Sequence, residues 1–286
     1  MTATLMEGRP LAERIRAQVA EDVRALGSIG LATVQVGEDE ASSIYLRLKH
    51  KAAAEVEISS VDRKLPHTIS EDDLLEEVAA LNADDAIDGI LVQLPLPDHI
   101  DEARVIGAVE PVKDVDGFHP FNAGQLYLGR PTHVPATPLG VMTLLAEYKL
   151  PLDGARAVVV GRSTIVGKPV AHLLLQAHAT VTICHSHTDD LARHTLDADV
   201  LVVAAGVAEV ISADMVKSGA AVVDVGINRT EEGILGDVDP DVASRAAFLT
   251  PVPGGVGPMT IAMLLQNTIQ AARYRRGHLA FPEIQR

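Results

Sequence analysis

Tryptophan is absent from this 286-residue chain, aromatic residues make up 3% of it, and it has one cysteine, Cys184. A single cysteine excludes an intramolecular disulfide and a cysteine-based zinc site, and it fits a reducing compartment. The sequence also has no apolar run of about 18 residues free of charged or strongly polar side chains, and no basic-then-apolar secretory pattern at its N-terminus. These absences predict a cytoplasmic protein without a membrane span.

Basic residues are scarce as well. Lys and Arg number 24 against 39 Asp and Glu, which gives a formal net charge of -15. Such a surface repels polyanions, so nucleic-acid binding is not expected. Any anionic small ligand must then be held by a local positive patch that opposes the overall field.

The length and the alternating pattern predict two α/β domains with a cleft between them. In the first half, helical periodicity over 10–26, 42–56 and 71–84 alternates with extended patterns over 31–37, 58–66 and 88–97. Ser70 is placed to cap the third of these helices. A β-α-β-α-β series of this kind predicts a small, mostly parallel sheet.

From residue 154 the pattern restarts with apolar strands over 155–160, 180–184, 199–206, 220–226 and 246–255, with helices expected between the first four of them. Continuous apolar strands are buried on both faces, as in a doubly wound Rossmann-type sheet. A helix over 136–150 links the halves, and a last helix over 257–276 is expected to pack back onto the first domain. The predicted domains are therefore 1–138 joined by 257–286, and 139–256.

The stretch "AVVVGRSTIVGKPVAHLLL" (157–175) has the features of a phosphate cradle. A glycine at the end of a buried strand allows a tight turn, and the helix that follows offers free N–H groups. Gly161, Ser163 and Gly167 match the dinucleotide fingerprint only loosely in spacing, whereas Pro169 suits a first helical turn. The alternative is an ordinary strand-to-helix turn that binds nothing.

The next strand favours NADP over NAD. NAD sites usually place an acid about 20 residues on, at the end of the second strand. Here that strand ends in Cys184-His185-Ser186-His187, with no acid before Asp189. A 2′-phosphate would instead be bound by Arg162 and Ser186. His185 and His187 alternate at a strand end, where solvent-facing side chains are the more common outcome, so no metal site is predicted.

A second group of polar residues lies in the first half. Tyr45 and Lys49 are four residues apart and share a helical face, with Ser42 one turn before. Gln93 sits inside the apolar run "DGILVQLPLP" and requires a partner, because an unpaired buried amide costs roughly 1–3 kcal/mol. In "VKDVDGFHP", Asp114 and Asp116 flank a valine, and turn capping is the simplest role for one of them.

Seven segments together resemble the bifunctional methylenetetrahydrofolate dehydrogenase/cyclohydrolase family. They run in order from about residue 36 to 268: "SSIYLRLKHKAA", "DGILVQLPLP", "VKDVDGFHPFN", "ATPLGV", "VVVGRSTIVGKPV", "VVDVGIN" and "TPVPGGVGPMT". The resemblance implies oxidation of 5,10-methylenetetrahydrofolate with hydride transfer to NADP, followed by hydrolysis of the methenyl product to 10-formyltetrahydrofolate. It also implies a homodimer.

The resemblance assigns roles to individual residues. Lys49 matches the catalytic lysine, Gln93 the glutamine that assists it, Tyr45 a tyrosine beside the folate, and Asp116 the acid that binds the pterin. The remaining expected folate contacts are Ser42, Leu94, Pro95, Pro253, Gly254 and Gly255. The expected NADP contacts are Gly161, Arg162, Ser163, Ile165, Val166, Ser186, Ala205, Gly206, Gly226 and Ile227.

Two alternatives stay open at this point. One is another two-domain NADP-dependent dehydrogenase, similar to shikimate dehydrogenase, whose catalytic pair is a lysine and an aspartate. The other is a nucleotide-binding module without turnover, in which damage at Lys49, Gln93 or Asp116 is expected. All three residues are intact.

Overall fold

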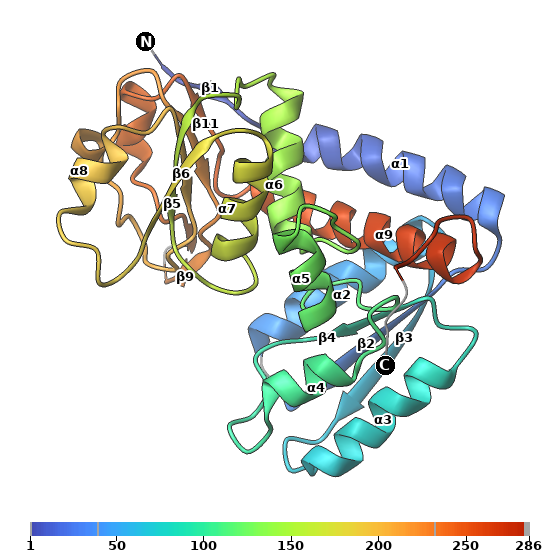
Figure 1. Cartoon of the computed structure of the whole chain (residues 1–286). Helices are drawn as coiled ribbons and strands as arrows, with labels where there is room; N and C mark the ends of the chain where they lie inside the picture. Colours follow the sequence, from blue (N-terminus) through green and yellow to red (C-terminus); the bar gives the residue numbers. More distant parts are fainter. Residues whose placement is uncertain (1, 39, 232, 283–286) are drawn as a thin grey trace. The chain divides into compact units, whose positions relative to one another are not determined.

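The chain folds into two compact units. Residues 2–38, 40–231 and 233–282 are described by a computed structural model, apart from the side chains of residues 40–42. Unit 1 consists of Met1–Glu13 and Thr137–Thr260, and unit 2 consists of Arg14–Ala136 and Ile261–Arg286. Each unit contains a parallel sheet with helices (Figure 1), so the predicted two-domain α/β fold class is confirmed.

Unit 1 is built on a six-stranded sheet in which all neighbouring strands are parallel. In spatial order the strands are β1 (Thr4–Leu5), β11 (Phe248–Leu249), β8 (Ala221–Asp224), β7 (Val200–Val203), β5 (Arg156–Val160) and β6 (Thr180–Cys184). The chain runs from β5 outward to β6 and then returns to β7 on the other side of β5. This reversal makes the carboxyl end of β5 the topological switch point, where α/β sheets bind ligands.

The central strands of unit 1 are buried along all or most of their length, as their apolar sequences predict. Every residue of β7 and β8 is buried, and so are the last four residues of β5. The helices of this unit are α6 (Ala136–Glu147), α7 (Gly167–Gln176) and α8 (Leu191–Thr195), with 3₁₀ turns η1 (Ala213–Met215) and η2 (Pro240–Ser244).

Unit 2 is built on a three-stranded parallel sheet with β2 (Gly30–Val36) between β3 (Ser59–Leu65) and β4 (Gly89–Val92). Apolar side chains of α3 (Glu71–Ala83) and α4 (Glu102–Ala108) form one core cluster with side chains of β2 and β4. Helix α2 (Glu40–Glu55) lies along the other face, where Thr33 of β2 hydrogen-bonds to His50. Ser70 caps α3 through its hydroxyl, which accepts the Asp73 N–H at 3.1 Å, as predicted.

Two helices pass from unit 1 into unit 2, and α6 begins in unit 2 with its first residue, Ala136; hydrogen bonds explain how the segments are grouped. Helix α1 (Gly8–Leu26) and helix α9 (Val256–Arg275) each begin in unit 1 and continue in unit 2. Residues 1–13 group with unit 1 because β1 pairs with β11, whereas the sequence interpretation placed them with the first domain. In α9, the Asn267 side chain donates to the carbonyls of Val115 and Val134, both in unit 2.

One predicted helix is wrong. A helix was expected between β7 and β8, but the described structure there is the short turn η1. The backbone before it is used elsewhere, since the Ile211 N–H donates to the Asp237 carbonyl and the Glu209 N–H to Gly236. Several described elements were not predicted: strand β1, helices α4 and α5 (Pro120–Tyr127), the turn η2, and strands β9 (Asn228–Thr230) and β10 (Gly233–Leu235), which form a hairpin. No helix among the described residues has the length and apolarity of a membrane span.

Candidate active site

In unit 2, helix α2 and the end of strand β4 bring the predicted lysine and glutamine together. The Lys49 ammonium donates to the Gln93 side-chain oxygen, with Nζ and Oε1 separated by 3.2 Å. The Gln93 amide nitrogen donates in turn to the Leu94 carbonyl at 2.8 Å, which fixes the side chain with its oxygen toward the lysine. Gln93 is half-buried, and the partner that its side-chain oxygen finds is Lys49.

The two acids of "VKDVDGFHP" have separate surroundings. Asp114 is buried, and one of its oxygens accepts the His119 N–H and the Asn122 side-chain amide, both at 2.8 Å. This is the turn-capping role expected for one of the pair. Asp116 is only partly buried and lies inside the turn that ends at Gly117, whose φ is 69° and whose N–H donates to the Asp114 carbonyl at 3.2 Å. Its carboxylate is the one that interacts electrostatically with Lys49.

Burial shifts the protonation of both members of this pair. Desolvation lowers the pKa of the Lys49 ammonium from its ordinary value, and the Asp116 charge opposes that shift. Desolvation raises the pKa of Asp116 to about 7, the Lys49 charge opposes the rise, and Asp114 adds to it. The Lys49 amine is therefore more readily uncharged than that of a solvated lysine, and it lies beside a carboxyl group whose pKa is about 7.

Lys113 anchors the segment that carries Asp116. Its side chain is buried, and the ammonium donates to the carbonyls of Leu81, Asn82 and Asp84 at 3.1, 2.7 and 2.9 Å. These carbonyls lie at the carboxyl end of α3, where a cation is favourable. Sequence analysis missed this residue, because its partners are backbone groups about 30 positions away.

The other predicted folate residues of unit 2 lie close to this pair in sequence. Tyr45 is half-buried one turn before Lys49 on α2, and Leu94 and Pro95 follow Gln93 directly, with a cis peptide bond between them. Ser42 belongs to α2, but its side chain is outside the described set.

In unit 1, the predicted phosphate loop occupies the switch point after β5. A Cβ on Gly161 would come within 2.2 Å of the Ala204 carbonyl, and one on Gly167 within 2.3 Å of the Gly161 carbonyl, so both positions require glycine. The Ser163 hydroxyl accepts the N–H groups of Val166 and Gly167, each at 3.2 Å. Ser163 thus closes the start of α7, and Ile165 is exposed on the loop.

Arg162 and Ser186 are placed at equivalent positions on adjacent strands. Val160 of β5 is in register with Cys184 of β6, and the two candidate residues each follow two positions later. Both are exposed at the carboxyl edge of the sheet, as a 2′-phosphate site requires. The rings of His185 and His187 are 6.0 Å apart, and the described residues contain no cluster of three potential metal ligands.

The loops after β7 and β8 carry the remaining cofactor candidates, Ala205, Gly206, Gly226 and Ile227. Two buried acids that sequence analysis missed hold these loops: Asp237 accepts the N–H groups of Ala205 and Gly206, and Asp224 accepts the N–H of Gly226. A signal for Asp224 was present in the sequence, because it interrupts the apolar run "AAVVDVG" just as Gln93 interrupts "DGILVQLPLP".

The segment with Pro253, Gly254 and Gly255 connects β11 to α9. Its glycines serve the chain's own packing: a Cβ on Gly255 would lie 2.7 Å from the Thr250 side chain, and the Gly254 carbonyl accepts the Gly8 N–H at 3.0 Å. The predicted reason for these glycines was close approach to a ligand. The described contacts give a structural reason at Gly255 and leave Gly254, with a φ of 117°, in more open surroundings.

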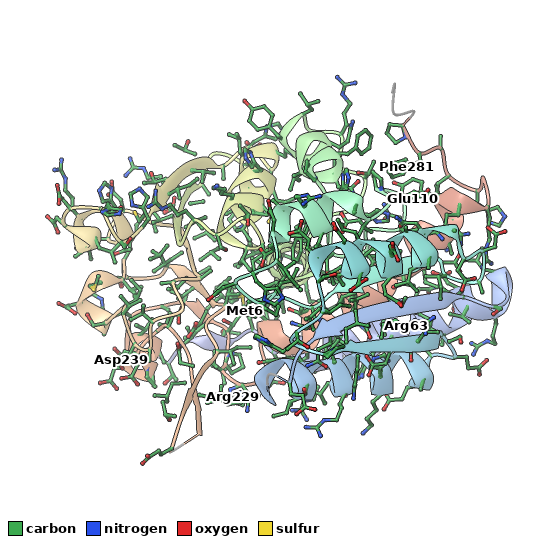
Figure 2. The ribbon with its side chains drawn as sticks, turned by 90° about the horizontal axis from the view of Figure 1, so that it is seen from below. Met6, Arg63, Glu110, Arg229, Asp239 and Phe281 are labelled. Carbon is green, nitrogen blue, oxygen red and sulfur yellow. The ribbon has the colours of Figure 1, made fainter. Side chains whose placement is uncertain are left out.

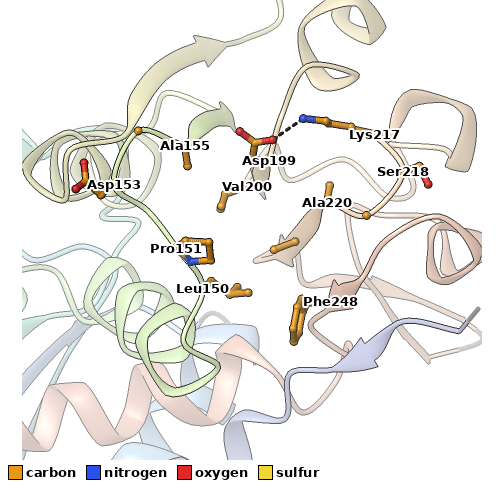
Figure 3. A pocket seen from close by; sticks show the side chains of 13 residues that line it. Leu150, Pro151, Asp153, Ala155, Asp199, Val200, Lys217, Ser218, Ala220 and Phe248 are labelled. Atoms are coloured by element: carbon orange, nitrogen blue, oxygen red, sulfur yellow. Dashed lines mark hydrogen bonds and ion pairs between the residues drawn. The ribbon is translucent and has the colours of Figure 1, made fainter.

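A cavity of about 470 Å³ lies at the opposite edge of the unit 1 sheet, near the amino ends of β5, β7, β8 and β11. Figure 3 shows its walls, with Leu150, Pro151 and Phe248 opposite an ion pair between Asp199 and Lys217. Ligands of α/β sheets gather at the carboxyl ends, and the two charges here neutralise each other. The cavity is therefore separate from the predicted nucleotide site.

Comparisons with known proteins match both units to one family. Residues 6–116 match the model "Tetrahydrofolate dehydrogenase/cyclohydrolase, catalytic domain", and residues 135–276 match its "NAD(P)-binding domain". The "Bifunctional protein FolD" of Burkholderia thailandensis is 56% identical over 278 residues, covering 95% of this chain and 98% of the relative.

Two solved structures are similar along nearly the whole chain. The bifunctional enzyme FolD of Campylobacter jejuni is 48% identical with a TM-score of 0.94, covering 96% of this chain and 99% of that one. The Trypanosoma brucei methylenetetrahydrofolate dehydrogenase-cyclohydrolase, solved with NADP cofactor and inhibitor, is 40% identical with a TM-score of 0.92 and covers 98% and 100%.

Proposed function

Because the chain belongs to the tetrahydrofolate dehydrogenase/cyclohydrolase family, we propose that it is a bifunctional folate enzyme. It oxidises 5,10-methylenetetrahydrofolate to the methenyl cation and hydrolyses that cation to 10-formyltetrahydrofolate. NADP supplies the chemistry of the first step by accepting the hydride. The observation that carries the proposal is the contact of Lys49 with Gln93, beside Asp116, in a desolvated site.

Lys49 acts as the base of the hydrolytic step. Its amine, whose pKa desolvation lowers, takes in its uncharged form a proton from the water that attacks the methenyl carbon. The carbon's bond to N5 then breaks and the formyl group remains on N10, so one water is added and one proton is released. Gln93 holds the amine in place through its side-chain oxygen, which accepts from Nζ at 3.2 Å.

Asp116 binds the pterin. Its carboxylate can accept hydrogen bonds from the amino group and ring N–H of a pterin, and charge-assisted bonds of this kind are among the stronger ones. Hydride transfer needs no acid or base from the protein, so positioning of the two rings is the main contribution of the remaining residues. We assign that role to the folate and NADP contacts predicted from the sequence.

The test of the function is a direct assay. The purified protein is mixed with methylenetetrahydrofolate and NADP, and formation of NADPH and of the methenyl and formyl products is followed. Turnover of both steps is expected. A shikimate dehydrogenase-like enzyme would reduce NADP with shikimate instead, and a non-catalytic module would bind the nucleotide without turnover; either result overturns the proposal.

The cyclohydrolase should respond to pH near neutrality. The pKa of Asp116 is raised to about 7, so the group is largely protonated at pH 6 and largely ionised at pH 8. Since the ionised form accepts the pterin's hydrogen bonds, kcat/KM for the methenyl substrate is expected to rise with pH through this range. Asp116→Asn should lower kcat/KM and remove the step from the pH profile. A step of unchanged size in the variant would exclude Asp116 as its source.

Arg162 should select NADP over NAD. Loss of its charge-assisted contact with a 2′-phosphate in Arg162→Ala is expected to raise KM for NADP about 10- to 100-fold and leave KM for NAD unchanged. Arg156→Ala is a matched control, because Arg156 begins β5, the strand that leads to Arg162, and its side chain is 62% exposed. Equal KM increases for the two cofactors would contradict the assignment.

The compartment and assembly state complete the proposal: a cytoplasmic homodimer. The single cysteine agrees with a reducing compartment, and the family resemblance supports the dimer. Light scattering should give twice the chain mass of 30.3 kDa.

A further inference from the structure

Two buried carboxylates lie at the carboxyl edge of the unit 1 sheet and are not part of the reaction described above. Asp224 is the last residue of β8, and Asp237 follows β10; their exposed fractions are 3% and 0%. Buried acids are rare unless they are paired or hydrogen-bonded, so each requires a set of donors. Here the donors come almost entirely from loop backbone.

Asp237 connects two loops. Its Oδ2 accepts the N–H groups of Ala205 and Gly206 at 2.7 and 2.8 Å, and its Oδ1 accepts the Asn228 side-chain amide at 2.8 Å. Ala205 and Gly206 lie just beyond β7, and Asn228 begins β9. The Asp237 side chain thus connects the loop after β7 with the start of the β9–β10 hairpin.

Asp224 holds Asp237 in place. Its Oδ1 accepts the N–H groups of Gly226 and Asp237 at 2.9 and 3.0 Å, and its Oδ2 accepts the Val238 N–H at 3.0 Å. Glycines give both carboxylates room: a Cβ on Gly226 would lie 2.2 Å from an Asp237 oxygen, and one on Gly236 would lie 1.8 Å from an Asp224 oxygen. The two acids and two glycines therefore form one interlocked unit.

We propose that Asp237 is a positioning residue for the nucleotide cofactor, which sets the loop after β7 through its bonds to Ala205 and Gly206, with Asp224 as its support. The inference rests on the proposed assignment of Ala205, Gly206, Gly226 and Ile227 to NADP. Those four residues lie on the two loops that the acids tether, beyond the carboxyl ends of central parallel strands, where such sheets bind nucleotides.

A carboxylate is needed at Asp237 because every group hydrogen-bonded to its two oxygens is a donor. Two backbone N–H groups and one amide N–H converge on its two oxygens, and only a carboxylate offers acceptors on both sides. In Asp237→Asn one oxygen is replaced by an NH₂ group, which would face at least one N–H donor. The loop is then released or displaced without any change in side-chain size.

Asp237→Asn is the central variant. The dissociation constant for NADPH, measured by its fluorescence, is expected to rise about 10-fold or more. Cyclohydrolase activity assayed with methenyltetrahydrofolate and no cofactor should stay within about two-fold of wild type, since a loop that positions only the cofactor does not act in that step. Asp239→Asn is the matched control: Asp239, labelled in Figure 2, caps η2 two residues away, and its carboxylate accepts the Asp241 N–H.

The outcomes separate the inference from the proposed function. Unchanged NADPH binding in Asp237→Asn, or an equal fall in both activities, overturns the positioning role. If this variant does not fold, Asn228→Ala, which removes one of the hydrogen bonds to Asp237, provides the test. Weaker NADPH binding with intact cyclohydrolase activity supports the positioning role, and unchanged NADPH binding rejects it. Failure of wild type to bind NADPH or turn over folate would instead reject the function itself.

Discussion

Replacing Lys49 with methionine is expected to lower the cyclohydrolase rate by about 10²- to 10⁴-fold, the usual contribution of a general base. Methionine keeps the length and apolar stem of the side chain but has no amine to take a proton from water. Gln93 loses the donor that its oxygen faces at 3.2 Å, yet its own amide remains bonded to the Leu94 carbonyl. The dehydrogenase should continue, because hydride transfer requires no protein base.

The two activities are measured separately, with methylenetetrahydrofolate and NADP for one and methenyltetrahydrofolate alone for the other. Lys51→Met serves as the control, since Lys51 is exposed on the same helix two positions later and is not part of the proposed site. It should leave both rates unchanged. If Lys49→Met reduces both activities equally at saturating substrate, the lysine has a shared role in binding or folding and is not the base of one step.

Replacing Asp88 with alanine is expected to destabilise the protein by about 3–5 kcal/mol, the usual cost of breaking a buried ion pair from one side. Asp88 is 2% exposed, and its two oxygens contact Arg275 of α9 and the adjacent Arg276 at 2.7 and 3.1 Å. It also accepts the Gly30 N–H at the start of β2. The substitution removes the acceptor for all three groups and leaves a mostly buried guanidinium without its closest carboxylate.

Thermal unfolding followed by circular dichroism measures this effect, and the midpoint should fall by about 10 °C. Asp85→Ala is the matched control, because Asp85 forms an ion pair with the same Arg275 at 3.4 Å but its side chain is fully exposed. Exposed pairs contribute little, so its midpoint should hardly move. Similar midpoints for the two variants would show that burial of Asp88 is not what makes the contact important.

The Lys49–Gln93 contact was within reach of sequence reasoning because two local rules meet there. Helical spacing placed Tyr45 and Lys49 on one face of a helix. Gln93, a polar residue in an apolar run, indicated that its side chain needs a hydrogen-bond partner. The Gly161 loop was predictable for the same reason, since strand, turn and helix follow one another directly in the chain. In each case the information lies within a few residues or in a single strand.

The supporting contacts were not predictable in this way. Lys113 bonds to carbonyls of α3, Asp88 to side chains of α9 almost 190 positions later, and Asp237 to N–H groups about 30 positions earlier. From the sequence alone, each of these residues would be predicted to be an ordinary surface charge, because its partners come close only in the tertiary fold. The missing helix between β7 and β8 has a similar cause, because its backbone bonds to residues 236–237 instead of to itself.

The chain passes between its two units at residues 13/14, 136/137 and 260/261, and each passage falls inside a helix, namely α1, α6 and α9. Neither unit is therefore encoded by a single contiguous stretch. Recombination that exchanged the nucleotide-binding part for that of another enzyme would have to splice three helices in mid-turn and preserve their register. Gene fission or the exchange of one unit therefore cannot easily separate the two activities.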